Sequence, residues 1–399
     1  MKKENDVSGS TIPLHARPLT RAYSKLITSS EVDATTHSLG HVARANTKRA
    51  ALDEKKANAP KKRAILKDIT NEISPKVHVV KHTQYFLLLN LLVISNNMTI
   101  NIKQIEKVGA VSTVANILKV IDIDSDEKDP LLCSLYAPEI YHNLRVAELQ
   151  RRPFPDYMER TQRDLTQTMR GILVDWLVEV SEEYKLVPDT LYLTVYLIDW
   201  FLHGNYIERQ RLQLLGVTCM FIASKYEEIF APRIEEFCFI TDNTYTKDQV
   251  LEMESQVLKH FSFQIYTPTS KTFLRRFLRA AHASDLQKPS VEMEFLANYL
   301  IELTLIDYEF LKFLPSVIAA SAVFLAKWTL NQSSHPWNPT LEHYTTFKAS
   351  DLKASVHALQ DLQLNTKGCT LTSIRLKYKQ EKLKSVAVLS SPELPDRLF

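Results

Sequence analysis

Residues 214–228 read LLGVTCMFIASKYEE, and residues 314–328 read LPSVIAASAVFLAKW. Both stretches are rich in alanine, serine, glycine, cysteine and valine, and both have large apolar residues and a lysine towards their C-terminal ends. Small residues let neighbouring helices approach closely, and a helix that is apolar nearly all round has to lie at the centre of its domain. Two such helices, 100 residues apart, predict an all-α protein built from a duplicated helical bundle.

Helical periodicity surrounds both central stretches. Thr246 and Gln249 form a capping box ahead of one helix, and Pro268 and Pro315 stand where helices are expected to begin. Glycine is scarce, with 7 residues in 399, which disfavours glycine-rich phosphate loops and turn-dense β folds. A first short helix is expected at 137–150. The expected helices of the first set cover 166–186, 191–202, 208–229, a short helix that begins at Pro232, and 250–261, and those of the second set cover 269–281, 291–305, 316–330, 340–347 and 349–362.

Residues 1–83 have a different composition. They are polar and short of aromatic residues, and they hold 16 Lys/Arg against 8 Asp/Glu, although the whole chain has a net charge of only +3. We expect a disordered, basic regulatory tail. Positive charge on a tail, with a mildly acidic body, favours nuclear import or a polyanionic partner over a DNA-binding core.

Residues 84–125 form an anomalous apolar segment. It begins with QYFLLLNLLVI, at 84–94, which is much shorter than the roughly 20 residues that cross a bilayer. The segment is a buried strand, an interfacial segment, or a gene-model artefact absent from the mature protein, and periodicity does not choose among them. The predicted domains after it are an N-terminal helix with a first helical box at 126–266 and a second box at 267–390.

The sequence carries no pattern typical of an enzyme or a metal site. It lacks G-x-G-x-x-G, G-x-x-x-x-G-K-[ST], H-E-x-x-H and G-x-S-x-G. Its four cysteines form no C-x-x-C pair, which favours reduced thiols over a disulfide framework. We therefore expect no catalytic residues, no metal and no cofactor.

The stretch MRGILVDWLVEV, at 169–180, is expected to form a helix whose apolar surface is too wide to be covered by a single contact with the core. Met169, Ile172, Leu173 and Trp176 share one helical face. The helix is either wholly buried or lines with this face an exposed groove that binds peptides. Arg170 lies within the run.

Two charged residues in apolar surroundings are expected to need partners. Arg170 and Asp199 each lie within an apolar helical stretch, so the simplest arrangement pairs them across the first two helices. Lys225 suits a helix C-terminus, but Glu227 and Glu228 beside it do not. Glu254 lies in a mostly apolar helix. A solvated helix end is the default interpretation, and the alternative is that this unfavourable acidic end has a binding partner.

Several long motifs, in order, resemble one family. MRGILVDWLVEV, LYLTVYLID, LQLLGVTCMFIASKYEE and ITDNTYTKDQVLEME resemble the first cyclin box, and the second helical set resembles the second box. With YAPEIYHNLRVAELQ and HPWNPTLEHYT, the chain is most similar to the A-type cyclins of plants. The resemblance implies two five-helix cyclin folds in tandem and a regulatory subunit that binds and activates a cyclin-dependent kinase from S phase to G2/M.

The resemblance also assigns roles to residues. Arg170 and Asp199 match the pair that braces the first box, and Trp200 follows Asp199 where the family usually has arginine, at a position we expect to be exposed. Residues that match the kinase-binding surface are Lys225, Glu254, Ile222, Tyr226, Glu228 and Phe263. Residues that match the docking patch for substrates and inhibitors bearing Arg-x-Leu are Met169, Ile172, Leu173, Trp176, Glu179, Leu212 and Gln213.

The tail carries a stretch that is similar to a degradation signal. RAILKDITN, at 63–71, resembles the destruction box of mitotic cyclins, with Arg63, Leu66 and Asn71 at its defining positions. The tripeptide Lys3-Glu4-Asn5 resembles a second degron. These matches imply the anaphase-promoting ubiquitin ligase as a partner.

The resemblance further implies a nuclear location with a cytoplasmic pool, and neither a membrane nor direct nucleic acid as a partner. The alternative is an adaptor of the TFIIB or transcriptional-cyclin type. That class would want an N-terminal zinc ribbon and a basic core, and the sequence shows neither.

Overall fold

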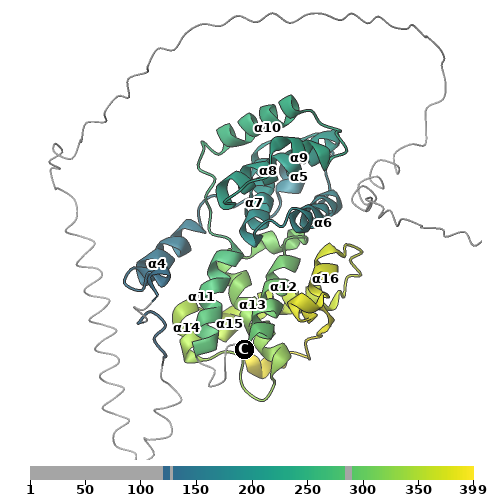
Figure 1. Cartoon of the computed structure of the whole chain (residues 1–399). Helices are drawn as coiled ribbons and strands as arrows, with labels where there is room; N and C mark the ends of the chain where they lie inside the picture. The colour runs from purple at the N-terminus through teal and green to yellow at the C-terminus, as the bar shows by residue number, and fades with distance from the viewer. Residues whose placement is uncertain (1–119, 126–128, 284–289) are drawn as a thin grey trace, which may run out of the picture. The chain divides into compact units, whose positions relative to one another are not determined.

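The computed structural model describes residues 120–125, 129–283 and 290–399, and these residues contain helices and no strand (Figure 1). The predicted tail, both predicted degrons and residues 84–119 of the apolar segment lie outside the described residues. No helix in the described part of the chain has the length and apolar character that crossing a membrane requires.

The first set of helices confirms the predicted five-helix bundle. Two shorter helices precede it, α4 (Ala137–Ala147) and α5 (Tyr157–Thr161). The set itself consists of α6 (Gln167–Glu183), α7 (Pro188–Gly204), α8 (Leu212–Glu227), α9 (Ile234–Phe239) and α10 (Lys247–His260).

The second set repeats this order. It consists of α11 (Ser270–Ala283), α12 (Val291–Leu303), α13 (Pro315–Leu330), α14 (Pro339–Thr345) and α15 (Ala349–Leu364), and α16 (Ser373–Tyr378) follows it. Short 3₁₀ turns complete the described structure at Pro130–Leu132, Arg209–Arg211, Tyr308–Lys312, Glu381–Leu383, Val386–Val388 and Asp396–Leu398.

The two stretches rich in small residues form the central helices of the two sets. Every residue of α8 from Leu212 to Ser224 is buried, and α8 packs against α6, α7, α9 and α10 (Figure 1). Helix α13 packs in the same way against α11, α12 and α15. A Cβ atom added to Gly216 would lie 2.7 Å from Leu173 Cδ1, so a larger residue here would require the buried Leu173 side chain to shift.

Local signals account for several helix ends. The Thr246 hydroxyl accepts a hydrogen bond from the Gln249 backbone N–H at 3.3 Å, and Gln249 Oε1 accepts one from the Thr246 N–H at 2.8 Å, which confirms the predicted capping box. Pro188 and Pro315 occupy the first positions of α7 and α13, where their missing N–H costs no helical hydrogen bond.

Candidate functional site

The buried ion pair predicted from the sequence is present between α6 and α7, on the side of the first set that meets the second. Arg170 on α6 donates from Nη2 and Nε to the Asp199 carboxylate on α7, at 2.7 and 3.0 Å. The Tyr157 hydroxyl donates to the same carboxylate at 2.9 Å. Both charged side chains are almost fully buried. The pairing of Arg170 with Asp199 is therefore confirmed, and Tyr157 is a further member of the group.

The same arginine connects the first set with the second. Arg170 Nη1 donates to the carbonyl oxygens of Leu305 and Ile306, which follow α12. On the neighbouring side, the Tyr308 hydroxyl accepts a hydrogen bond from the Met158 N–H at 2.9 Å. A buried guanidinium with a carboxylate and two carbonyls as acceptors is fully satisfied, so this group positions the boxes and is not available to a partner.

The apolar face of α6 is largely enclosed. Leu173 is inaccessible and Trp176 is only 2% exposed, so both belong to the core. Met169 and Ile172 remain partly exposed. Of the two arrangements that the sequence left open, the structure is nearer to the buried helix, because Trp176 offers almost no accessible surface in this state. What remains is a smaller apolar surface formed by Met169 and Ile172.

Segments distant in sequence cover the rest of α6. The Ser373 backbone N–H donates to Asp175 at 3.0 Å, and its hydroxyl donates to Glu179 at 2.9 Å. Burial raises the pKa of both carboxyl groups, and the hydrogen bonds from Ser373 oppose that shift. Leu212 and Gln213, predicted to flank the patch, are buried at the start of α8, so their accessible surface is small as well.

Lys225 and Glu254 meet at the other end of α8. The Lys225 ammonium forms an ion pair with the Glu254 carboxylate of α10, and it lies over the Phe221 ring, 3.9 Å from its centroid. The structure thus brings together the two charges that the sequence analysis placed on one binding surface. Their pairing links the C-terminal end of α8 to the middle of α10.

Two other residues assigned to that surface have internal positions. Ile222 is buried in the core at 2% exposure, so it offers a partner almost no contact area in this state. Glu228 Oε1 accepts hydrogen bonds from the Val187 N–H at 2.8 Å and from the Thr190 hydroxyl at 2.6 Å. Glu228 therefore holds the start of α7, a structural role that the sequence analysis did not foresee.

Large apolar side chains lie exposed just beyond the two helices that the Lys225–Glu254 pair joins. Ile229 and Phe230, just beyond α8, are 91% and 92% exposed, and Phe263, beyond α10, is 70% exposed. Tyr226 and Tyr266 are about half exposed. We call Lys225, Tyr226, Ile229, Phe230, Glu254 and Phe263 the α8–α10 surface.

Ile229, Phe230 and Tyr266 were missed in the sequence analysis. The sequence did contain a signal. The Ile-Phe pair between Glu228 and Pro232 belongs to no continuing helical pattern that would bury both side chains.

The backbone holds Phe263 outward. Ser262 and Phe263 both have positive φ, 50° and 61°, a conformation that is unfavourable for residues other than glycine. The Phe263 N–H donates to the Leu258 carbonyl at 2.9 Å and closes the end of α10. A strained conformation that displays an aromatic ring to solvent is typical of a functional position.

Trp200 does not occupy the exposed position expected for it. Its ring is partly buried, stacked on Tyr196 at 6.5 Å and edge-on to His203 at 5.2 Å between ring centroids. The expectation was wrong because neighbouring aromatic rings on α7 provide a packing surface for the indole.

The part of the chain that the structure describes shows no group of three or more His, Cys, Asp or Glu residues placed to hold a metal ion. None of its four cysteines forms a disulfide bond. The features that remain are therefore surfaces, namely the α8–α10 surface and the smaller patch at Met169 and Ile172.

Comparisons with known proteins agree with this architecture. A family model described as "Cyclin, N-terminal domain" matches residues 139–266, and one described as "Cyclin, C-terminal domain" matches residues 268–392. A viral cyclin from herpesvirus saimiri has a similar fold, with a TM-score of 0.50 and 21% identity over 55% of this chain and 95% of its own.

Plant relatives are much more similar in sequence. Cyclin-A2-4 of Arabidopsis thaliana is 66% identical, with all of both chains covered. Cyclin-A2-1 of Oryza sativa subsp. japonica is 66% identical over 71% of this chain and 57% of its own. The chain therefore belongs to the cyclin family, whose members are regulatory subunits of cyclin-dependent kinases, and within that family to the A-type cyclins of plants.

Proposed function

We propose that this chain activates its cyclin-dependent kinase through the α8–α10 surface, and that the active complex serves the passage from S phase to G2/M. The observation that carries the proposal is the exposure of large apolar side chains just beyond the two helices that the Lys225–Glu254 pair joins. Single exposed apolar residues are ordinary, but several of them gathered at one place are typical of a protein-binding surface.

The charges at the centre of this surface supply orientation. In the free chain Lys225 and Glu254 satisfy each other, so the surface carries no isolated charge. On binding, each can pair with a group of opposite charge on the kinase, while Ile229, Phe230 and Phe263 are removed from water. Buried apolar area supplies most of the affinity, and charge complementarity fixes the register of the two proteins.

Activation follows if this surface binds the active arrangement of the kinase more tightly than the inactive one. A rigid surface does this best, and the contacts of the free chain favour rigidity. Glu228 ties the loop after α8 to the start of α7, and Ile222 packs beneath it in the core. In this proposal both residues support the surface from within. The surface itself holds a mobile helix of the kinase in its active position.

The patch on α6 is the proposed docking site for substrates and inhibitors bearing Arg-x-Leu. Met169 and Ile172 offer apolar contact to the leucine, with Leu173, Trp176 and Leu212 as the buried floor beneath them. Glu179 is the nearest partly exposed carboxylate of the same helix, and a carboxylate suits a guanidinium. Gln213 completes the set at the start of α8.

Regulated destruction belongs to the same proposal. Arg63, Leu66 and Asn71, with Lys3, Glu4 and Asn5 as a second signal, are proposed to present the chain to the anaphase-promoting ubiquitin ligase. The basic tail is proposed to support a nuclear location with a cytoplasmic pool. Replacing Arg63 and Leu66, together with residues 3–5, by alanine should lengthen the lifetime of the protein in synchronised cells without changing kinase binding.

The decisive experiment removes the charged pair. Lys225→Ala with Glu254→Ala should weaken kinase binding by about 2 kcal/mol or more, which is roughly 30-fold in Kd. The matched control is Lys247→Ala with Glu235→Ala, because that ion pair also joins α10 to a neighbouring helix and is exposed at 3.0 Å. Kinase affinity and phosphorylation rate would be measured for both. A folded Lys225/Glu254 variant that activates the kinase as well as the control does would refute the proposal.

A further inference from the structure

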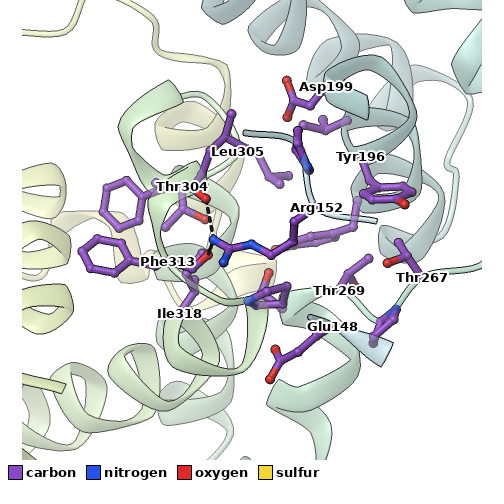
Figure 2. Close-up of a pocket in the computed structure, with 18 of the residues that line it drawn as sticks. Glu148, Arg152, Tyr196, Asp199, Thr267, Thr269, Thr304, Leu305, Phe313 and Ile318 are labelled. Carbon is purple, nitrogen blue, oxygen red and sulfur yellow. Dashed lines mark hydrogen bonds between the residues drawn. The ribbon is translucent and has the colours of Figure 1, made fainter. Parts of the chain in front are cut away.

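A cavity of about 130 Å³ lies where the two helical sets meet (Figure 2). Two aromatic side chains of α7 and two that lie just before α13 line it, namely Tyr192, Tyr196, Phe310 and Phe313. Val195, Leu305 and Ile318 add aliphatic surface. Gln150, also in the lining, is exposed, so the cavity is open to solvent. It shares no residue with the α8–α10 surface or with the patch on α6.

The charged groups of the lining balance one another. They are three arginines and three carboxylates, namely Arg151, Arg152, Arg170, Glu148, Asp199 and Asp307. Arg170 pairs with Asp199, and the Glu148 carboxylate accepts hydrogen bonds from the Ser316 N–H and hydroxyl at 2.9 and 2.7 Å. The lining therefore carries no net charge that would attract an ion of either sign.

The polar groups of the lining are also satisfied by the protein. Arg152 Nη2 donates to the carbonyl oxygens of Leu311 at 2.7 Å and Phe313 at 3.1 Å, and Arg151 Nη1 donates to the Gln264 carbonyl at 2.6 Å. Within the described chain, no side-chain polar atom of the lining is both buried and without a hydrogen-bond partner. A charged group on a ligand would lose its water here without compensation, which favours a neutral ligand.

The volume and the aromatic lining define the ligand further. An apolar cavity of about 150 Å³ in another protein holds one benzene molecule, so the present cavity of about 130 Å³ has room for a single six-membered ring. Aromatic rings make favourable edge-on and offset contacts with one another, and the lining offers four of them. Arg152 extends across the centre of the view in Figure 2, and a guanidinium attracts the face of an aromatic ring.

We propose that this cavity binds a neutral molecule with a single aromatic ring, placed between α7 of the first box and the residues before α13 of the second. Apolar surface of both boxes is removed from water when the ring enters, and this burial supplies the affinity. Because the walls come from both boxes, such a ligand stabilises their packing against each other.

Fluorobenzene is the appropriate probe, because fluorine NMR detects its binding directly. Fluorocyclohexane is neutral and of similar size but has no aromatic face, and 4-fluorobenzoate has the ring together with a charge. The full chain would be titrated with each compound. We expect fluorobenzene to bind about 10-fold or more tightly than 4-fluorobenzoate and about 3-fold more tightly than fluorocyclohexane. Fluorobenzene that does not bind, or that binds no better than either counterpart, overturns the proposal without any variant being needed.

Three variants locate the site. Val195→Phe fills the cavity and should lower fluorobenzene affinity about 10-fold or more, and Leu311→Trp should act in the same direction from a partly exposed position of the lining. The second variant is included because overpacking at the buried Val195 can destabilise the fold. Val388→Phe is the matched control, since it adds the same ring at a valine that is 63% exposed and outside the lining, and it should leave affinity unchanged.

Urea denaturation would show which variants are folded. A folded Val195 or Leu311 variant that binds fluorobenzene as tightly as the wild type contradicts the assignment. Loss of binding in the Val388 variant, equal to that in the filled variants, contradicts it as well, because the probe would then not distinguish the cavity from the surface.

Discussion

The two cyclin boxes share a fold but differ at the ends of their central helices. Beyond α8 the chain exposes Ile229 and Phe230 to solvent. The end of α13 is covered by the chain's own C-terminus. There the Trp328 indole N–H donates to the Glu393 carbonyl at 3.1 Å, and the Phe399 ring stacks on Phe324 with 5.2 Å between centroids.

This difference leaves exposed apolar surface at the end of the central helix in only one of the two boxes, as far as the structure describes them. Leu394 and Leu398 of the C-terminal segment are buried against the second box, so apolar surface there is covered within the chain. The corresponding region of the first box has no such cover among the described residues. A partner that seeks exposed apolar surface at the end of a central helix therefore finds it on the first box.

The two boxes also differ in the residues that pair with a buried acid. Each buries an acid as the twelfth residue of its second helix, Asp199 in α7 and Glu302 in α12. Asp199 is satisfied by Arg170 and Tyr157, whereas Glu302 accepts hydrogen bonds from Lys377 and Tyr378, both at 2.8 Å. In the first box the cation comes from the preceding helix. In the second box the cation is Lys377, which lies on α16.

The largest effect is expected from breaking these buried pairs. Asp199→Ala leaves Arg170 charged and unpaired in the core, which should lower the free energy of unfolding by about 3–5 kcal/mol. Glu302→Ala should cost less, because Lys377 keeps an ion pair with Glu182 at 3.3 Å. Urea denaturation of both variants measures the comparison.

Arg170→Met with Asp199→Leu provides the control for that experiment. Replacing both charges by apolar groups of similar size is often close to neutral, although here it also leaves the carbonyls of Leu305 and Ile306 without their donor. The double variant should therefore be more stable than Asp199→Ala. If it is less stable, the cost of the single change does not come from an unpaired charge.

The next largest effect concerns the cover of the second box. Leu398→Ala should cost about 2 kcal/mol, the low end of the range for a buried leucine, because a chain end can partly collapse into the space. Tryptophan fluorescence should change as well, since Trp328 is bonded to the same segment. Arg397→Ala, at an exposed neighbour, should change neither property. Leu398→Ala is expected to leave kinase affinity unchanged. A large loss of affinity would show that the kinase also engages the second box.

A smaller effect on stability is expected at the open end of the first box. Ile229→Ser and Phe230→Ser should each alter the free energy of unfolding by no more than about 0.5 kcal/mol, because neither side chain is buried. Kinase affinity should nevertheless fall, since apolar anchors at the centre of an interface commonly contribute about 2 kcal/mol or more. Titration calorimetry with the kinase, beside urea denaturation, separates the two quantities. Unchanged affinity would remove Ile229 and Phe230 from the proposed interface.

Much of this fold could be predicted from the sequence because local patterns determine it. The small-residue stretches at 214–228 and 314–328 form the two central helices, and Thr246 caps α10 as predicted. The Arg170–Asp199 pair could be inferred as well, because two isolated charges in adjacent apolar helices have few other ways of being satisfied.

Features that depend on distant segments could not be predicted. Ser373 bonds to Asp175 and Glu179 across about 200 residues of sequence, and no periodicity in α6 indicates that cover. The partial burial of Trp200 depends on the rings of Tyr196 and His203, and the bonds from Glu228 to α7 depend on how a loop folds back. Periodicity shows which face is apolar, but it does not show what covers that face.

The smallest effect is a dependence of stability on pH that arises in the first box. Burial lowers the pKa of His260, and it lowers the pKa of His203, where the nearby His260 adds to the effect. Since the unfolded chain then binds more protons than the folded one, stability is complete above the ordinary histidine pKa of about 6.5 and declines as the pH falls below it.

Buried carboxyl groups act in the opposite direction. The raised pKa values of Glu148, Asp175 and Glu179 favour the folded state at low pH, and their contribution is lost as the pH rises through those values. The histidine effect therefore has to be measured as a difference between variants. His260→Gln is suitable because Asn205 Nδ2 lies 3.1 Å from His260 Nδ1, and a glutamine oxygen can accept the same hydrogen bond.

Unfolding of the wild type and of His260→Gln would be followed in urea at several pH values from about 7.5 to 5.5. The loss of stability on acidification should be smaller in the variant, while His142→Gln, at an exposed position on α4, controls for the removal of a histidine. Identical pH dependence in all three proteins would mean that His260 takes up its proton equally well in the folded and unfolded chains. The pH dependence would then not distinguish the first box from the second.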